Sequence, residues 1–156
     1  MPIAQPQSHD FLLCRSGECL CALPLAHVAE TMRPLPTRAV PDMPPFLLGV
    51  AVIRGTTTPV VSLAQLLGEP APATPNRFVT LRMANRIVAL ACDAVLGIRA
   101  LAAQSLADIP LLSQALDSSS VAAIGLLDAE LMLVLHSARM IPSAAWAALD
   151  APEPAL

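Results

Sequence analysis

The chain has 156 residues, of which 55% are hydrophobic and 13% charged, and its net charge is −3. It is long enough for one domain or two small fused halves with a sizeable core, and with three Phe, one Trp and no Tyr that core must be mainly aliphatic. No cluster of Lys and Arg is available to neutralise phosphates, which argues against nucleic-acid binding and against a basic membrane-binding face. Charged residues interrupt every apolar run well before about 20 residues, and the start of the chain lacks the pattern of a signal peptide, so we expect a cytoplasmic protein without membrane insertion.

Sixteen prolines divide the chain into segments. Residues 34–45 and 69–76 are too rich in Pro for a helix or a central strand, because Pro lacks an N–H and fixes φ. Residues 1–10 and 151–156 are expected to be flexible tails. The domain between the tails, 11–150, is therefore built from short segments.

The first segment, 11–33, holds two apolar runs around Ser16-Gly17, and the segment 76–99 repeats this design around Ala84-Asn85. Each predicts a β-hairpin. Without gaps, an offset of 67 residues superimposes identical residues: Phe11 on Phe78, Arg15 on Arg82, Ala22 on Ala89, Leu23 on Leu90 and Val28 on Val95. The chain therefore reads as a repeat of one design.

A second similarity links "TTTPVVSLAQLL" with "LMLVLHSARMI", each a strand followed by a short helix. Ser62 is placed to cap a helix at 63–67 and Gly68 to end it. Ser137 and Ser143 could cap two later helices, the last being "AAWAALD". We predict two similar halves, about 11–69 and 76–142, in a mainly β protein of two small barrels. The segment 100–117 breaks the pattern and is either a helical turn or a long loop.

The four cysteines, Cys14, Cys19, Cys21 and Cys92, show neither zinc spacing nor a C-x-x-C redox motif. We interpret them as reduced, buried thiols that act as small hydrophobes. Cys19 or Cys21 with His27, and Ser62 with His136, are candidate nucleophile pairs. They lack a nucleophile elbow, an oxyanion motif and a third orienting group, so we expect no enzyme activity, no metal and no cofactor.

Four stretches carry a family resemblance: "CLCALPLAHVAETMRPLP", "MPPFLLGVAVIRGTTTPVVSL", "IVALACDAVLGI" and "IGLLDAELMLVLHSARMI". The most specific part is G-V-x-x-x-R-G followed by P-V-V-x-L. Over about 11–142 the chain resembles the CheW family, the adaptors of bacterial chemotaxis-type signalling arrays. Val52 stands where the family has Asn, Ser62 where it has Asp, and the threonines 56–58 replace a more apolar run. The resemblance implies two intertwined, five-stranded, SH3-like barrels with a few short helices.

The resemblance also implies a non-catalytic adaptor at receptor arrays under the inner membrane. One partner would be the cytoplasmic hairpin tip of a chemoreceptor, held in an apolar groove between the barrels. The other would be the regulatory domain of the histidine kinase CheA, with the region 79–88 as a candidate contact. An adaptor of a non-flagellar pathway for pili, surface motility or development is the alternative, and self-association stays open. A lone kinase regulatory domain is a third reading, against which the start at Met1 and the tail ending at Leu156 argue.

The residues expected at or near the receptor groove surround the G-V-x-x-x-R-G motif and its partner strand: Val28, Glu30, Leu48, Gly49, Ile53, Arg54 and Gly55. Arg54 precedes a glycine at which the chain must turn, so its guanidinium can reach sideways. We expect it to pair with Glu30 at the edge of the first barrel, flanked by Val28 and Ile53. The alternative is a solvent-exposed Arg whose stem lies along apolar surface.

Overall fold

The computed structural model describes residues 8–70, 74–83, 86–102, 106–108, 121–127, 130–135 and Trp146. These residues form eleven strands, one short α-helix and one 3-10 turn, which confirms the prediction of a mainly β fold. None of the helices among them is long and apolar enough to cross a membrane. In chain order the elements are β1 (Ser8–Ser16), β2 (Cys19–Pro24), η1 (Leu25–His27), β3 (Val28–Met32), β4 (Leu47–Ile53), β5 (Thr56–Ser62), α1 (Leu63–Leu66), β6 (Arg77–Met83), β7 (Arg86–Cys92), β8 (Ala94–Ala102), β9 (Leu106–Asp108), β10 (Val121–Leu127) and β11 (Glu130–Leu135).

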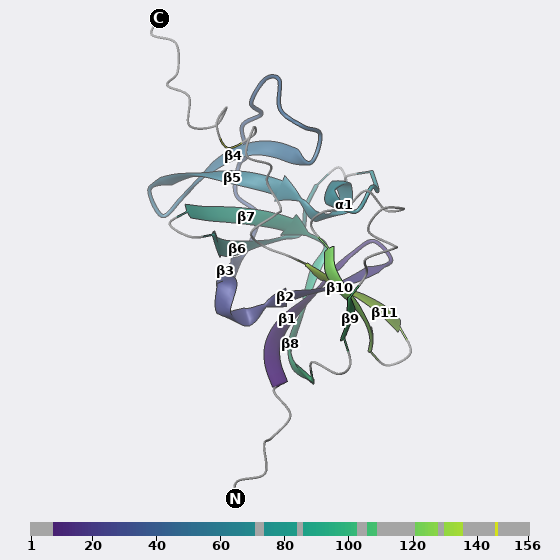
Figure 1. Ribbon diagram of the computed structural model, residues 1–156. Coiled ribbons are helices and arrows are strands. Elements are labelled where there is room, and N and C mark those ends of the chain that lie inside the picture. The colour runs from purple at the N-terminus through teal and green to yellow at the C-terminus, as the bar shows by residue number, and fades with distance from the viewer. Residues whose placement is uncertain are drawn as a thin grey trace, which may run out of the picture.

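The strands form two sheets, which Figure 1 shows one above the other. The upper sheet has the order β3-β6-β7-β5-β4 and the lower sheet the order β8-β1-β2-β11-β10-β9. Two five-stranded barrels were expected. The lower sheet has a sixth strand because the three residues of β9 pair with β10, in the segment whose structure the sequence left open.

The repeat of 67 residues is present in the register of the strands. Phe11 lies opposite Pro24 in the hairpin β1–β2, and Phe78 lies opposite Ala91 in the hairpin β6–β7. The hairpins thus share one register along their whole length, as predicted from their sequences. Ser16-Gly17 lies at the first turn, where Gly17 has φ +57°, whereas Ala84-Asn85 lies outside the described residues.

The third strand of each repeat is exchanged between the halves. β3 pairs with β6, so that Val28 lies opposite Leu81, and β8 pairs with β1, so that Val95 lies opposite Cys14. Both pairings shift register at the equivalent place, directly after these residues. Each sheet therefore contains strands from both halves of the chain.

The helix α1 follows the predicted capping. The Ser62 hydroxyl accepts a hydrogen bond of 3.3 Å from the Gln65 N–H, and Gly68 ends the turn with φ +82°. Leu63 of the helix is fully buried against the apolar residues of β1, β2, β6 and β7. Ser137, Ser143 and all of the last expected helix except Trp146 lie outside the described residues.

The Pro-rich segment 34–45 crosses the edge of β4. Arg38 and Val50 exchange two backbone hydrogen bonds of 2.8 Å, which partly covers this edge strand. Gly49 makes the approach feasible because it has φ +144° and no side chain. A Cβ at this position would lie 2.0 Å from the Arg38 carbonyl oxygen.

Replacing Gly49 with Ala should therefore combine backbone strain with a steric clash. Gly97 offers a matched control, since it has φ +129° but no heavy atom within 4 Å of an added Cβ. Gly97→Ala should cost about 1–3 kcal/mol through strain alone, and Gly49→Ala about 2 kcal/mol more. Urea unfolding followed by circular dichroism measures both. Equal losses would contradict the close contact with Arg38.

Candidate functional site

Arg54 lies in the two-residue turn that joins β4 to β5. Arg54 has φ +49° and Gly55 φ +76°, so both residues are left-handed, as in the type I′ turn that suits a tight hairpin. Gly55 adopts this conformation freely, whereas Arg54 does so against the steric preference of an L-residue. The turn directs the guanidinium out of the strand, and the side chain is 78% exposed.

The expected ion pair with Glu30 is present and bidentate. Arg54 Nε and Nη2 each donate a hydrogen bond of 2.7 Å to one carboxylate oxygen of Glu30. The backbone of Glu30 is fixed from the other side by the buried Thr80. Its hydroxyl accepts from the Glu30 N–H at 3.1 Å and donates to the Glu30 carbonyl at 3.3 Å.

The ion pair joins the two edges of the upper sheet. Glu30 belongs to β3 and Arg54 follows β4, and these strands stand first and last in the sheet order. Their side chains can meet only because the sheet curls round, consistent with the predicted barrel. Exposed ion pairs add little to the free energy of unfolding. The main effect of this contact is therefore to hold the Arg54 guanidinium in a fixed position at the sheet edge.

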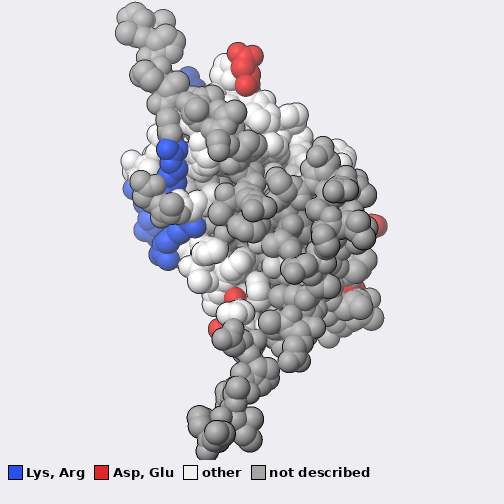
Figure 2. Space-filling view, viewed as in Figure 1, with Lys and Arg blue, Asp and Glu red and all other residues white. Residues whose placement is uncertain are grey.

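Behind the ion pair lies a cavity of about 330 Å³, which we call the Arg54 cavity. All five strands of the upper sheet contribute to its lining, which is Ala29, Glu30, Ile53, Arg54, Thr56, Thr58, Thr80, Arg82 and Ile87. Two of the threonines that replace a more apolar run, Thr56 and Thr58, belong to this lining. Basic side chains gather on the flank of the molecule where β5 and β7 project (Figure 2).

The structure brings together four of the seven residues expected at the receptor groove: Glu30, Ile53, Arg54 and Gly55. The other three lie elsewhere. Val28 packs against the apolar core, Leu48 borders a small cavity at the end of β7, and Gly49 is buried beneath Arg38. These three residues lie near the motif in the sequence, but in the structure they do not line the Arg54 cavity and instead contact other parts of the fold.

A second concave surface, which the sequence did not indicate, lies on the lower sheet around β8. Leu96 is 50% exposed and Ile98 57% exposed, on either side of Gly97. They border a cavity of about 220 Å³ whose lining is Leu13, Arg15, Leu20, Leu96, Gly97, Ile98, Arg99 and Glu130. The 67-residue repeat relates it to the Arg54 cavity, since Leu96 and Gly97 occupy the positions of Ala29 and Glu30. That offset, applied to Glu30, is the signal that could have found it.

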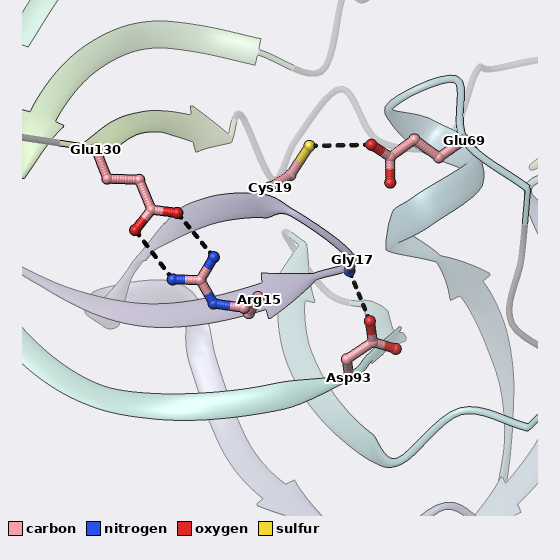
Figure 3. A network of polar contacts seen from close by, with 6 residues as sticks. All are labelled: Arg15, Gly17, Cys19, Glu69, Asp93 and Glu130. Atoms are coloured by element: carbon pink, nitrogen blue, oxygen red, sulfur yellow. Dashed lines mark hydrogen bonds and ion pairs between the residues drawn. The ribbon is translucent and has the colours of Figure 1, made fainter.

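This β8 surface has an ion pair of its own (Figure 3). Arg15 donates hydrogen bonds of 2.8 and 3.0 Å to the two carboxylate oxygens of Glu130. The neighbouring turn is held by Asp93, which accepts a hydrogen bond of 2.6 Å from the Gly17 N–H. Both sheets thus present a concavity beside a bidentate Arg–Glu pair.

Several described residues of the region 79–88, considered for the kinase contact, belong to the core or to the Arg54 cavity. Val79, Leu81 and Val88 are fully buried, and Arg82 and Ile87 already line the Arg54 cavity.

The candidate nucleophiles lack the required environment. Burial raises the pKa of Cys21 to about 12, and burial together with Glu69 raises the pKa of Cys19. Both sulfurs therefore stay protonated at neutral pH and are poor nucleophiles. Ser62 is buried and its hydroxyl caps α1, while its suggested partner His136 lies outside the described residues.

The Glu30–Arg54 pair should be visible in titration. Hydrogen bonding from Arg54 lowers the pKa of Glu30, so the stabilisation is present above the unfolded-state pKa and is lost as the pH falls through the folded-state pKa. In Arg54→Asn, which keeps a residue that tolerates the left-handed turn, the pKa of Glu30 should rise towards its usual value. Carbon-13 NMR of the carboxylates measures this. Glu130, whose pKa is lowered by Arg15, is the internal control and should not move; an unchanged Glu30 would contradict the pairing.

Comparison with known proteins places the chain in a family. The model of the CheW-like domain family matches residues 10–145. A probable chemotaxis protein CheW from Rhizobium etli is 26% identical over 129 residues, which are 81% of this chain and 83% of that protein. The crystal structure of the scaffolding protein TtCheW from Thermoanaerobacter tengcongensis superimposes with a TM-score of 0.79 at 18% identity, covering 89% of this chain and 96% of that one. The chain therefore belongs to the CheW-like domain family.

Proposed function

We propose that this protein is a non-catalytic adaptor that couples chemoreceptors to the histidine kinase CheA. Membership of the CheW-like family supports a role in chemotaxis-type signalling. The observation that carries the proposal is the pair of related concave surfaces, one at each sheet, because an adaptor needs two docking sites on one rigid body.

The receptor would dock at the Arg54 cavity. Its cytoplasmic tip is a helical hairpin, and a helix contacts a concave surface through side chains spaced three and four residues apart. Ile53 and Ile87 supply apolar contact inside the cavity, and the exposed Val52 on β4 supplies it on the strand beside the turn. The ion pair fixes the position of the Arg54 guanidinium, so that a helix meets a shaped and charged surface.

The kinase regulatory domain would dock at the β8 surface. Leu96 and Ile98 are two of the four large apolar side chains that stand exposed among the described residues. Exposed apolar side chains that lie together mark interaction sites in soluble domains. The adaptor would work beside receptor tips at the cytoplasmic face of the inner membrane, in a flagellar or a non-flagellar pathway.

Two variants test whether the receptor and the kinase domain bind at separate surfaces. Arg54→Asn should weaken binding of a receptor cytoplasmic hairpin about tenfold and leave binding of the CheA regulatory domain within about twofold. Leu96→Ser combined with Ile98→Ser should have the opposite selectivity. Isothermal titration with both partners from the same cell measures all four affinities, and each variant is the control for the other.

Urea unfolding checks that both variants remain as stable as the wild type to within about 1 kcal/mol, as expected for exposed positions. Failure of the wild-type protein to bind either partner would overturn the adaptor role. Loss of both affinities in both folded variants would overturn the assignment of separate surfaces.

A further inference from the structure

Three of the four cysteines meet in the core between the two sheets. Cys14 on β1 lies directly opposite Cys21 on β2, and Cys92 is the last residue of β7 in the other sheet. All three are buried members of one apolar cluster, and all are free thiols. None of the three cysteines lines the Arg54 cavity or the cavity at β8.

The crossing from β7 to β8 brings Cys92 against Cys14. Directly after Cys92, the Asp93 N–H donates a hydrogen bond of 2.9 Å to the Arg15 carbonyl, and Ala94 then lies opposite Arg15 at the start of β8. The Cys92 thiol donates a hydrogen bond of 3.9 Å to the Ala94 carbonyl at the start of β8. Hydrogen bonding between the two thiols raises the pKa of Cys14 and lowers the pKa of Cys92.

The repeat shows that packing does not require sulfur here. Sixty-seven residues from Cys14 and Cys21 stand Leu81 and Val88, also opposite one another, and 67 residues before Cys92 stands Leu25. At equivalent positions of the repeat, one hairpin has aliphatic side chains and the other has thiols. The fold can therefore form without sulfur at these positions, and the thiols add the capacity for oxidation.

Cys92 also borders a small cavity. It lines a cavity of about 10 Å³ together with Ser16, Leu48, Ser62, Pro75, Ala91 and Asp93. A volume of this order admits a single water-sized molecule. Hydrogen peroxide is only slightly larger than water, whereas bulky oxidants would be excluded.

We propose that Cys92 and Cys14 form a disulfide when the folded protein meets hydrogen peroxide. The Cys92 sulfur attacks one peroxide oxygen, an S–O bond forms as the O–O bond breaks, and the departing hydroxide takes the Cys92 proton as water. Cys14 then attacks the sulfenic sulfur, an S–S bond forms as the S–O bond breaks, and the second hydroxide leaves with the Cys14 proton. Two thiols are oxidised and one peroxide is reduced to two waters.

The bond would tie β1 of the lower sheet to the end of β7 in the upper sheet. Because it closes a long loop of chain, it should raise the thermal midpoint of unfolding by about 5 °C or more. A thiol reductant should reverse the rise.

The test treats the full-length, reduced protein with hydrogen peroxide and maps the products by mass spectrometry. The folded wild type should lose the mass of two hydrogen atoms and yield a single peptide pair joining Cys14 to Cys92, faster than the urea-unfolded chain does. Cys21→Ala, at an equally buried position, and Cys19→Ser should still form the bond. Cys14→Ala should stop at Cys92 sulfenic acid, which a dimedone probe captures.

Other products would overturn the proposal. These are a bridge between Cys14 and Cys21, a dimer linked through Cys19, or oxidation that proceeds faster in urea than in the folded state. Protection of Cys14 and Cys92 in the folded protein, while Cys19 is oxidised, would overturn it as well.

Discussion

The exchange of β3 and β8 between the halves is the constraint on which the rest of the structure depends. β3 completes the upper sheet by pairing with β6, and β8 completes the lower sheet by pairing with β1. Each strand leaves its own hairpin and satisfies the backbone groups of the other one. Neither sheet can form from one half of the chain, so the two sheets are a single folding unit.

Both proposed docking surfaces are built on these exchanged strands. Each strand carries a register shift at the same point of the repeat, and a bulge of this kind redirects the side chains that follow it. In β3 the result is Glu30 aimed at Arg54, and in β8 it is the exposed pair Leu96 and Ile98. The repeat thus produces two similar concavities, each beside an Arg–Glu pair, one lined with three threonines and the other bordered by the exposed Leu96 and Ile98.

This construction suits an adaptor, which must hold two partners in a fixed relation and performs no chemistry on either. The surfaces lie on different sheets, and each includes a strand that pairs with a hairpin from the other half of the chain. A partner bound at one sheet therefore contacts an element anchored next to the other. The thiol cluster lies at the same crossing, where Cys92 leaves β7 and the chain joins the edge of β1.

Much of this architecture could be predicted from the sequence because its causes are local. Gly17 and Gly55 mark turns, Ser62 and Gly68 bound a helix, and the matched hairpins follow from strand periodicity. The Glu30–Arg54 pair was predicted from the family resemblance together with the turn.

The family resemblance implies intertwined barrels, but the residues alone do not predict the exchange of β3 and β8, because nothing local decides which hairpin an edge strand joins. The close contact of Gly49, expected near the receptor groove, also depends on pairing between distant segments. Its neighbour Arg38 reaches it through space, across a segment whose prolines carry no pairing signal. The exposure of Leu96 and Ile98 was not predicted either. Apolar residues in a strand are expected to be buried, and only the sheet order shows that β8 lies at an edge.

The central claim is that one rigid body carries two independent docking surfaces. Sedimentation velocity with a receptor hairpin, the CheA regulatory domain and this protein tests it most directly. The account predicts a ternary complex with one copy of each component, in which saturating receptor changes the affinity for the kinase domain by no more than about twofold. Competition between the two partners for one site would contradict it.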